Sequence, residues 1–495
     1  MRLGRDPPRD ADVRMSFVQQ PGTAPDRWDV GRVTIDVLPD VALLEIFDCL
    51  LNQLQDDNYL RYLKIRAWHT LVHVCQKWRS VVFGSPLRLN LRLFCTEYTP
   101  VREMLAIWPP LPIVVWQNDH PAWDIDNLLA ALEHNDRVCE ISLWGVTSLE
   151  LEQVLAPMQK PYLALTDLWM SWDKHGARPI VPASFLGGSA PRLRHLKLDY
   201  IPFPGLPKLL LSATHLVVLH LLRIPNSGYF TPEAIVTGLS TSTSLEVLLL
   251  EFESPLSRPK RESRRPPPLT RSILPALTVF RFKGSSEYLE DLVARIDTPL
   301  LDRLHIVFFH QLIFNTPQLT QFISRTPNLK TQGEARAIFS TSYVGVILPQ
   351  AFPRWLELGV TCRQSDWQLS SLAQIYSSAL PQALIPTMER LYIRDSFLSP
   401  YWQDDIEDNQ WLEVLHPFTS VKNLYLSREL TPSIAPALQE LVGERVIEVL
   451  PALQSLFLEE FLPSEPVQEA IGKFVAARQL AGHPIIVSHW DRDDE

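Results

Sequence analysis

The sequence predicts a mixed α/β chain in which a small helical unit precedes a long solenoid, with parallel strands inside and helices outside. Three observations indicate this. A strongly apolar helical hairpin lies near the start of the chain, and a seven-residue apolar frame recurs through the remainder. The length of 495 residues also exceeds what one compact core normally holds. Stacked repeats solve this problem, because each repeat buries its apolar face against its neighbours.

The early hairpin is more apolar than its own packing requires. Six apolar residues between Leu43 and Leu51 fall within an arc of roughly 160° when the stretch is drawn as a helix, whereas one neighbour covers about 100°. Residues 71–82, drawn as a helix, are also apolar along one side. Because so small a unit cannot bury both helices by itself, the hairpin predicts a further neighbour.

The hairpin carries an ordered series of short motifs. These are Leu38-Pro39, Leu43-Leu44-Glu45-Ile46-Phe47, Leu50, Val74-Cys75-x-x-Trp78-Arg79 and Ser85-Pro86-x-x-Leu89. In this order they resemble an F-box, the three-helix module that docks a Skp-type adaptor in a cullin ubiquitin ligase. The resemblance places the module at residues 32–91 and implies adaptor contacts through these side chains: Leu38, Pro39, Leu43, Ile46, Phe47, Leu50, Val74 and Trp78.

The resemblance has three departures. Val41 stands where the family often has Glu, Arg88-Leu89 stands where many members have a Leu-Trp pair, and the insert over residues 51–68 is longer than in the shortest versions. A different interpretation remains open, in which the hairpin is an ordinary helical cap that seals the end of a larger domain.

The second half of the prediction rests on the frame L-x-x-L-x-L-x. It starts at Val138, Leu165, Leu193, Leu216, Leu245, Leu277, Leu301, Met388, Val421 and Leu453. Starts up to Leu301 lie 23 to 32 residues apart, and the frame resembles leucine-rich repeats. Because strand side chains alternate, positions one, four and six are expected to face the core and positions three, five and seven to face outward. The repeats are placed at residues 92–495.

The repeats are expected to be irregular. The Asn or Cys that closes each turn in short leucine-rich repeats is missing, and the interval between Leu301 and Met388 offers only three candidate strands. These are residues 335–339, 344–348 and 356–361. Three Thr-Pro pairs predict helix starts with a capping Thr, at Thr231, Thr316 and Thr431. A helix over 466–480 and a strand over 484–490 are expected to cap the last repeat.

Three segments are predicted to lie outside the regular structure. Residues 1–31 are expected to be a disordered leader, because they carry little apolar content. The basic, Pro-rich segment near 256–270 is expected to be a disordered, solvated loop, with a nuclear-import or partner-binding patch as the alternative. Residues 404–408 are expected to form an exposed acidic loop.

Composition narrows the class of partner and the compartment. The net charge of −10 argues against nucleic acid and against anionic membrane surfaces. The five cysteines are scattered without a C-x-x-C pair, which is typical of a reducing compartment. The N-terminus has no apolar signal region, and no run reaches the roughly 18 apolar residues of a membrane span. A cytoplasmic or nuclear protein is expected.

No residue pattern predicts catalysis, a metal or a cofactor. His69 and His73 have the spacing of metal ligands on a helix, but Thr70 occupies the place where a zinc protease needs Glu. Glycine-rich phosphate loops are absent from the sequence. A non-enzyme is therefore expected, and an enzyme with an unrecognised site is a remote alternative.

The outward positions of the frames are the expected binding surface for a protein client. Aromatic and Arg side chains commonly anchor protein interfaces. The candidates are Trp144, Trp169, Lys197, His220, Arg281, His305, Tyr392, Arg394 and Tyr425. Together with the F-box resemblance, they indicate a substrate-recognition subunit of a Skp–cullin–F-box ubiquitin ligase. The alternative is a leucine-rich-repeat interaction scaffold that acts outside any ligase.

Overall fold

The computed structural model describes most of the chain. The described residues are 37–52, 68–96, 99–117, 125–255, 270–310, 315–329, 333–349, 354–362, 365–382, 384–395, 408–443, 445–459 and 464–491. The expected leader, the basic segment over 256–269 and the acidic residues 404–407 lie outside them. The chain divides into two compact units between Asn90 and Leu91, close to the point where the sequence placed the end of the helical module.

The first unit is helical. It contains α1 (Asp40–Asn52), a helical turn over residues 68–72, and α3 (Gln76–Gly84). The rings of Phe47 and Trp78 pack with their centroids 4.8 Å apart, which joins α1 to α3. The Lys77 ammonium also donates a hydrogen bond of 2.8 Å to the Leu38 carbonyl, so α3 fixes the chain that enters α1.

Residues 71–82 do not form the single helix that the sequence predicted. The helix ends at residue 72, residues 73–74 form a turn, and Cys75 becomes the N-cap of α3. The Cys75 sulfur accepts a hydrogen bond of 3.4 Å from the Trp78 amide, which begins the new helix. Val74 therefore lies in the turn between helices and not on an apolar helical stripe.

In the described part of the second unit, sixteen strands form one sheet. They are β1 (Leu93–Cys95), β2 (Ile113–Trp116), β3 (Val138–Val146), β4 (Asp167–Trp172), β5 (His195–Asp199), β6 (Val218–Ile224), β7 (Val247–Phe252), β9 (Val279–Gly284), β11 (Arg303–Phe309), β12 (Gly333–Ser340), β13 (Tyr343–Pro349), β14 (Trp355–Thr361), β15 (Met388–Asp395), β16 (Asn423–Leu426), β17 (Ser455–Leu458) and β18 (Ile486–His489). The short strands β8 (Ser272–Ile273) and β10 (Ile296–Asp297) pair separately.

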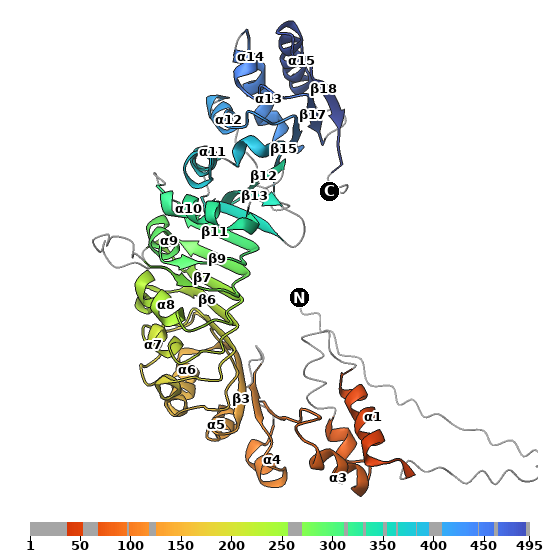
Figure 1. Ribbon diagram of the computed structural model, residues 1–495, viewed down its shortest axis with the longest axis vertical. Coiled ribbons are helices and arrows are strands. Elements are labelled where there is room, and N and C mark those ends of the chain that lie inside the picture. Colours follow the sequence, from red (N-terminus) through yellow and green to blue (C-terminus); the bar gives the residue numbers. More distant parts are fainter. Residues whose placement is uncertain are drawn as a thin grey trace, which may run out of the picture. The chain divides into compact units, whose positions relative to one another are not determined.

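The described helices lie on one face of this sheet, and none of them covers the other face, as Figure 1 shows. The helices are α4 (Val101–Ile107), α5 (Ile125–Leu132), α6 (Ser148–Leu155), α7 (Leu206–Leu210), α8 (Pro232–Leu239), α9 (Ser286–Val293), α10 (Pro317–Arg325), α11 (Ser365–Gln374), α12 (Asp408–Leu415), α13 (Thr431–Gln439), α14 (Arg445–Glu448) and α15 (Glu465–Leu480). We call the side without helices the open face.

The frame positions lie where the sequence predicted. Positions one, four and six of all ten frames are buried, each at most 6% exposed, as for Leu193, Leu196 and Leu198. Burying a Leu side chain stabilises the fold by about 1.5 to 3 kcal/mol, and the inward residues repeat this gain from strand to strand. The result is a long, mostly parallel sheet with an apolar core between sheet and helices, an architecture like that of leucine-rich repeats.

The sheet is not parallel throughout. The three candidate strands between Leu301 and Met388 are present as β12, β13 and β14, but they stand in reverse order between β11 and β15. β13 runs antiparallel to both of its neighbours, because the tight turn between Ser340 and Tyr343 returns the chain directly beside β12. The expectation of one parallel strand per repeat is therefore wrong in this segment.

The three Thr-Pro pairs behave differently. Thr231 caps α8 as predicted, since its hydroxyl accepts a hydrogen bond from the Ala234 amide. Thr316 is the N-cap residue of α10, but its hydroxyl donates to the Ser378 carbonyl instead. Thr431 is already the first residue of α13, so the prediction that it caps this helix is wrong.

The last repeat ends in a helix and a strand. α15 and β18 form where the sequence placed them, and Gly482 follows the helix with a φ of +81°. Arg478 of α15 is 1% exposed and donates hydrogen bonds to the carbonyls of Val446, Leu450 and Leu453. This buried guanidinium ties α15 to the preceding repeat, and no apolar pattern predicted it.

Candidate functional site

The helical unit exposes three apolar side chains that the F-box resemblance assigned to an adaptor. Ile46 is 41% exposed, Leu50 47% and Val74 57%. Ile46 and Leu50 are one turn apart on α1, and Val74 lies in the turn before α3. Exposed large apolar residues that gather in one small unit are a common feature of interaction surfaces.

Other residues of the implied adaptor set have different positions. Leu43 and Phe47 are fully buried inside the unit, so they support the exposed residues and offer a partner no surface. Trp78 is half-buried against Phe47. Pro39 is exposed and Leu38 half-buried, both just before α1. Direct adaptor contact through Leu43 and Phe47 stays a prediction, and both residues are buried in this structure.

In the second unit, seven of the nine candidate client-binding residues lie in one row across the open face. The strand register places Trp169 beside Lys197 and Lys197 beside His220. The same row continues through Leu249 to Arg281 and His305 on β9 and β11. It reaches Tyr392 and Tyr425 after crossing β14, β13 and β12.

Trp144 and Arg394 are the other two candidates, and each lies on a strand that also contributes a residue to this row. Trp144 lies two residues beyond Ser142, the row's member on β3, and its ring meets that of Trp169 edge-on at 5.9 Å between centroids. Arg394 follows Tyr392 by two residues on β15, and the register places it in the adjacent row. The frame therefore predicted correctly which side chains share the open face.

Arg281 and His305 contact acidic side chains of neighbouring strands. The Arg281 guanidinium forms an ion pair of 2.7 Å with Glu251 on the neighbouring strand β7. The His305 ring lies 3.5 Å from the Glu357 carboxylate, but burial lowers the pKa of His305 below its usual value. These internal contacts leave Arg281 and His305 less available to a partner than an unpaired residue would be.

An aromatic ladder occupies the row near the C-terminal end of the sheet. Tyr392 and Tyr425 stack with centroids 4.1 Å apart, and Phe457 stacks on Tyr425 at 4.4 Å. Trp490 meets the Tyr425 ring edge-on at 5.7 Å. Tyr392 is only 6% exposed, so Tyr425 and Phe457 carry most of the accessible aromatic surface.

A charged cluster that the sequence did not predict lies at the end of β5. Arg223 forms two hydrogen bonds with the Asp199 carboxylate and also lies over the Tyr200 ring, 4.3 Å from its centroid. Lys174 lies at the same distance from that ring. Arg223 has a φ of +50° at a register irregularity in β6, and this bulge directs its side chain back toward Asp199. Periodicity alone gives no signal for such a bulge.

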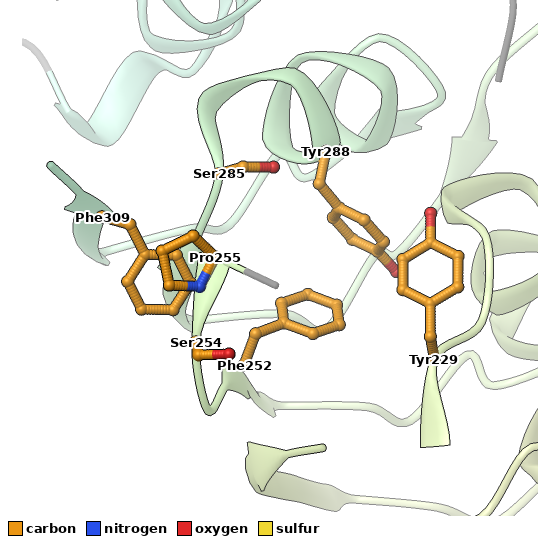
Figure 2. Close-up of a pocket in the computed structure, with 7 residues that line it drawn as sticks. All are labelled: Tyr229, Phe252, Ser254, Pro255, Ser285, Tyr288 and Phe309. Atoms are coloured by element: carbon orange, nitrogen blue, oxygen red, sulfur yellow. The ribbon is translucent and has the colours of Figure 1, made fainter. Parts of the chain in front are cut away.

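One small pocket lies beside the carboxyl ends of strands β7 to β11. Figure 2 shows its aromatic lining by Tyr229, Phe252, Tyr288 and Phe309. It encloses about 220 Å³ including space open to solvent, which is less than the roughly 300 to 1,000 Å³ of ligand pockets. The Tyr288 hydroxyl is buried and has no hydrogen-bond partner among the described residues.

The described residues contain no group of three or more His, Cys, Asp or Glu side chains placed to hold a metal ion. His69 and His73 do not share a helix, because His69 lies in the helical turn over residues 68–72 and His73 lies in the turn that follows. No helix in the described part of the chain has both the length and the apolar character needed to cross a membrane.

The two units together define a class: a strand-and-helix repeat protein with an open sheet face, preceded by a small helical unit with exposed apolar side chains. No protein-family model and no curated protein matches the chain. Among solved structures, the leucine-rich-repeat-containing protein LegL7 from Legionella pneumophila is similar at 14% identity, over 73% of this chain and 96% of that chain, with a TM-score of 0.26. With so low a score, the repeat assignment rests on the strands and their buried frames.

Proposed function

We propose that this chain is a substrate-recognition subunit of a Skp–cullin–F-box ubiquitin ligase. In this proposal the helical unit docks a Skp-type adaptor, and the open face of the sheet binds the protein to be ubiquitinated. The chemistry belongs to other subunits. This chain contributes proximity, because tethering a client beside the ligase makes their encounter effectively intramolecular.

The observation that carries the proposal is the exposure of Ile46, Leu50 and Val74 above a buried layer that contains Leu43 and Phe47. Leu43 and Phe47 are already packed within the helical unit, whereas Ile46, Leu50 and Val74 leave apolar surface that an adaptor would cover. Their positions coincide with the F-box motifs in the sequence. An adaptor that covers them would remove apolar surface from water at about 25 cal/mol per Å².

A pull-down with a recombinant Skp-type adaptor tests the docking. The wild-type chain is expected to retain the adaptor, and the double variant Ile46→Glu with Val74→Glu is expected to lose it, because two charges would enter an apolar interface. Both residues are exposed, so the variant is expected to fold. The matched control is Leu163→Glu with Leu480→Glu, which charges two exposed apolar residues of the solenoid, 60% and 90% exposed.

Equal retention of the wild-type chain and the double variant would contradict docking through this surface. The alternative function is then a repeat scaffold outside any ligase, which the open face favours independently of the helical unit. The scaffold predicts that the adaptor fails to bind, while proteins captured by the open face are unaffected by Ile46→Glu and Val74→Glu.

A further inference from the structure

Four side chains of the open face form a compact group that we call the Trp–Lys group: Trp144, Trp169, Lys197 and His220. They come from the neighbouring strands β3, β4, β5 and β6, and the last three occupy one row. The Lys197 ammonium lies 4.5 Å from the centroid of the Trp144 ring and 5.5 Å from that of Trp169. The two indoles therefore hold the ammonium between them by cation–π contact.

The indoles are held in place by the sheet itself. Gly145 has a φ of +62° at an irregularity between β3 and β4, which lets the strand bulge beside Trp144. The Trp144 indole donates a hydrogen bond of 2.9 Å to the Ser142 hydroxyl, and the Trp144 carbonyl accepts one of 2.9 Å from the buried Gln117 side chain. A binding group assembled before the partner arrives loses little conformational entropy on binding.

The Lys197 ammonium forms no ion pair with a carboxylate among the described residues, although the Asp199 charge is close enough to raise its pKa. The nearby acids have other partners, because Asp199 is bound by Arg223 and Asp167 lies 2.6 Å from the His195 ring. The open face thus presents a cation here, although the whole chain has a net charge of −10.

Lys197 and His220 both have lowered pKa values, and burial is the largest cause for each. Partial burial lowers the pKa of Lys197; the Asp199 carboxylate opposes this shift, and Arg223 adds a smaller lowering effect. Burial, followed by the charges of Lys197 and His195, lowers the pKa of His220 to about 4. A carboxylate close to both side chains would raise both pKa values, because a nearby negative charge favours the protonated forms.

We propose that the Trp–Lys group is a binding site for a carboxylate side chain on an acidic segment of a partner protein. The carboxylate would pair with the Lys197 ammonium and accept a hydrogen bond from His220, while the indoles pack against the aliphatic part of the same segment. Charge complementarity favours this occupant, because among the described residues Asp199 and Asp167 contact other side chains and Lys197 has no carboxylate in ion-pair contact. The inference rests on the proposed client-binding role of the open face.

The test uses the full chain and a fluorescein-labelled hexa-glutamate peptide, followed by fluorescence anisotropy. The wild-type chain is expected to bind the peptide, and Lys197→Met is expected to weaken binding about tenfold, which corresponds to the loss of one charge-assisted contact. Met retains the length and apolar packing of the Lys stem. The control is Lys208→Met, which removes an exposed Lys on α7 in the helix layer and is expected to leave binding unchanged.

Three results would overturn the proposal. The first is that the hexa-glutamate peptide fails to bind the wild-type chain. The second is that Lys197→Met and Lys208→Met weaken binding equally, and the third is that a hexa-lysine peptide binds Lys197→Met more tightly than it binds the wild-type chain. The third result would mean that the two indoles bind a cation of the partner, at a position that the Lys197 ammonium occupies in the free chain. Adaptor retention by the same Lys197→Met protein separates the two proposals, since a failed peptide test with intact adaptor binding overturns only the carboxylate site.

Discussion

At the scale of single residues, Leu249 and Leu250 are chemically identical neighbours on β7 that face opposite sides of the sheet. Leu250 is fully buried, and Leu249 is half-buried on the open face. We expect Leu250→Ala to lower the free energy of unfolding by about 2 to 5 kcal/mol, because it leaves a cavity, and Leu249→Ala to lower it much less. Urea unfolding of both variants checks this. Equal losses would mean that the two faces are misassigned.

A second residue-scale prediction concerns His220 and acid. Its pKa of about 4 in the folded chain is below the unfolded value of about 6.5. The unfolded chain therefore binds the extra proton first, and stability is lost as pH falls from about 6.5 towards 4. We expect His220→Gln to reduce the loss of stability between pH 7 and pH 5, measured by urea unfolding. The exposed His215→Gln is the control, and an unchanged loss in His220→Gln would contradict the assignment.

The residues that the sequence predicted follow from local rules, whereas those it missed depend on contacts between elements. Inward leucines follow from strand alternation, which is a local rule, and so the frames identified them. The contact of Lys197 with Trp144 depends instead on three strands in register and on a bulge at Gly145. The burial of Phe47 and the exposure of Val74 likewise depend on where the helix at 68–72 ends. Such features need the folded neighbours.

At the scale of elements, neighbouring repeats are joined by specific polar contacts as well as by apolar packing. The Glu290 carboxylate of α9 is 8% exposed and accepts hydrogen bonds of 2.9 and 2.8 Å from the amides of Gln318 and Leu319. It thus caps the N-terminus of α10, whose own Thr316 hydroxyl donates elsewhere. A negative charge at a helix N-terminus is favourable because of the helix dipole.

We expect Glu290→Ala to destabilise the solenoid by about 1 to 3 kcal/mol, because two helix amides lose a charged acceptor in a buried place. Amide hydrogen exchange at the start of α10 is the most specific measurement, and it should accelerate there more than in α6. The control Glu152→Ala removes an exposed carboxylate of α6 and is expected to have little effect. Unchanged protection of Gln318 and Leu319 would contradict this capping role.

The order of elements was harder to predict than their positions. The strands β12, β13 and β14 were expected where they occur, because each is a short apolar run. Their reversed order depends on a tight turn at residues 340–343 and on pairing with strands distant in sequence. Gly345 and Gly359 lie opposite each other in this segment, and a Cβ on either would collide with the Tyr343 ring. That requirement appears only after β13 and β14 have paired.

At the scale of the whole molecule, we propose different partners for the two units. In this proposal the helical unit presents apolar side chains to an adaptor, and the solenoid presents a row of aromatic and charged side chains to a client. Each proposed contact has its own variants, so either partner can be lost while the other remains. If both contacts form, the chain brings two proteins together.

The equilibrium affinity of a recombinant Skp-type adaptor for the full chain decides whether the helical unit docks an adaptor. Isothermal titration calorimetry is expected to give tight binding to the wild-type chain. Binding to Ile46→Glu with Val74→Glu is expected to be weaker by at least about 100-fold, with the circular dichroism spectrum unchanged. The Leu163→Glu and Leu480→Glu control should bind as the wild-type chain does. An adaptor that fails to bind the wild-type chain, or that binds both double variants equally, would contradict the claim.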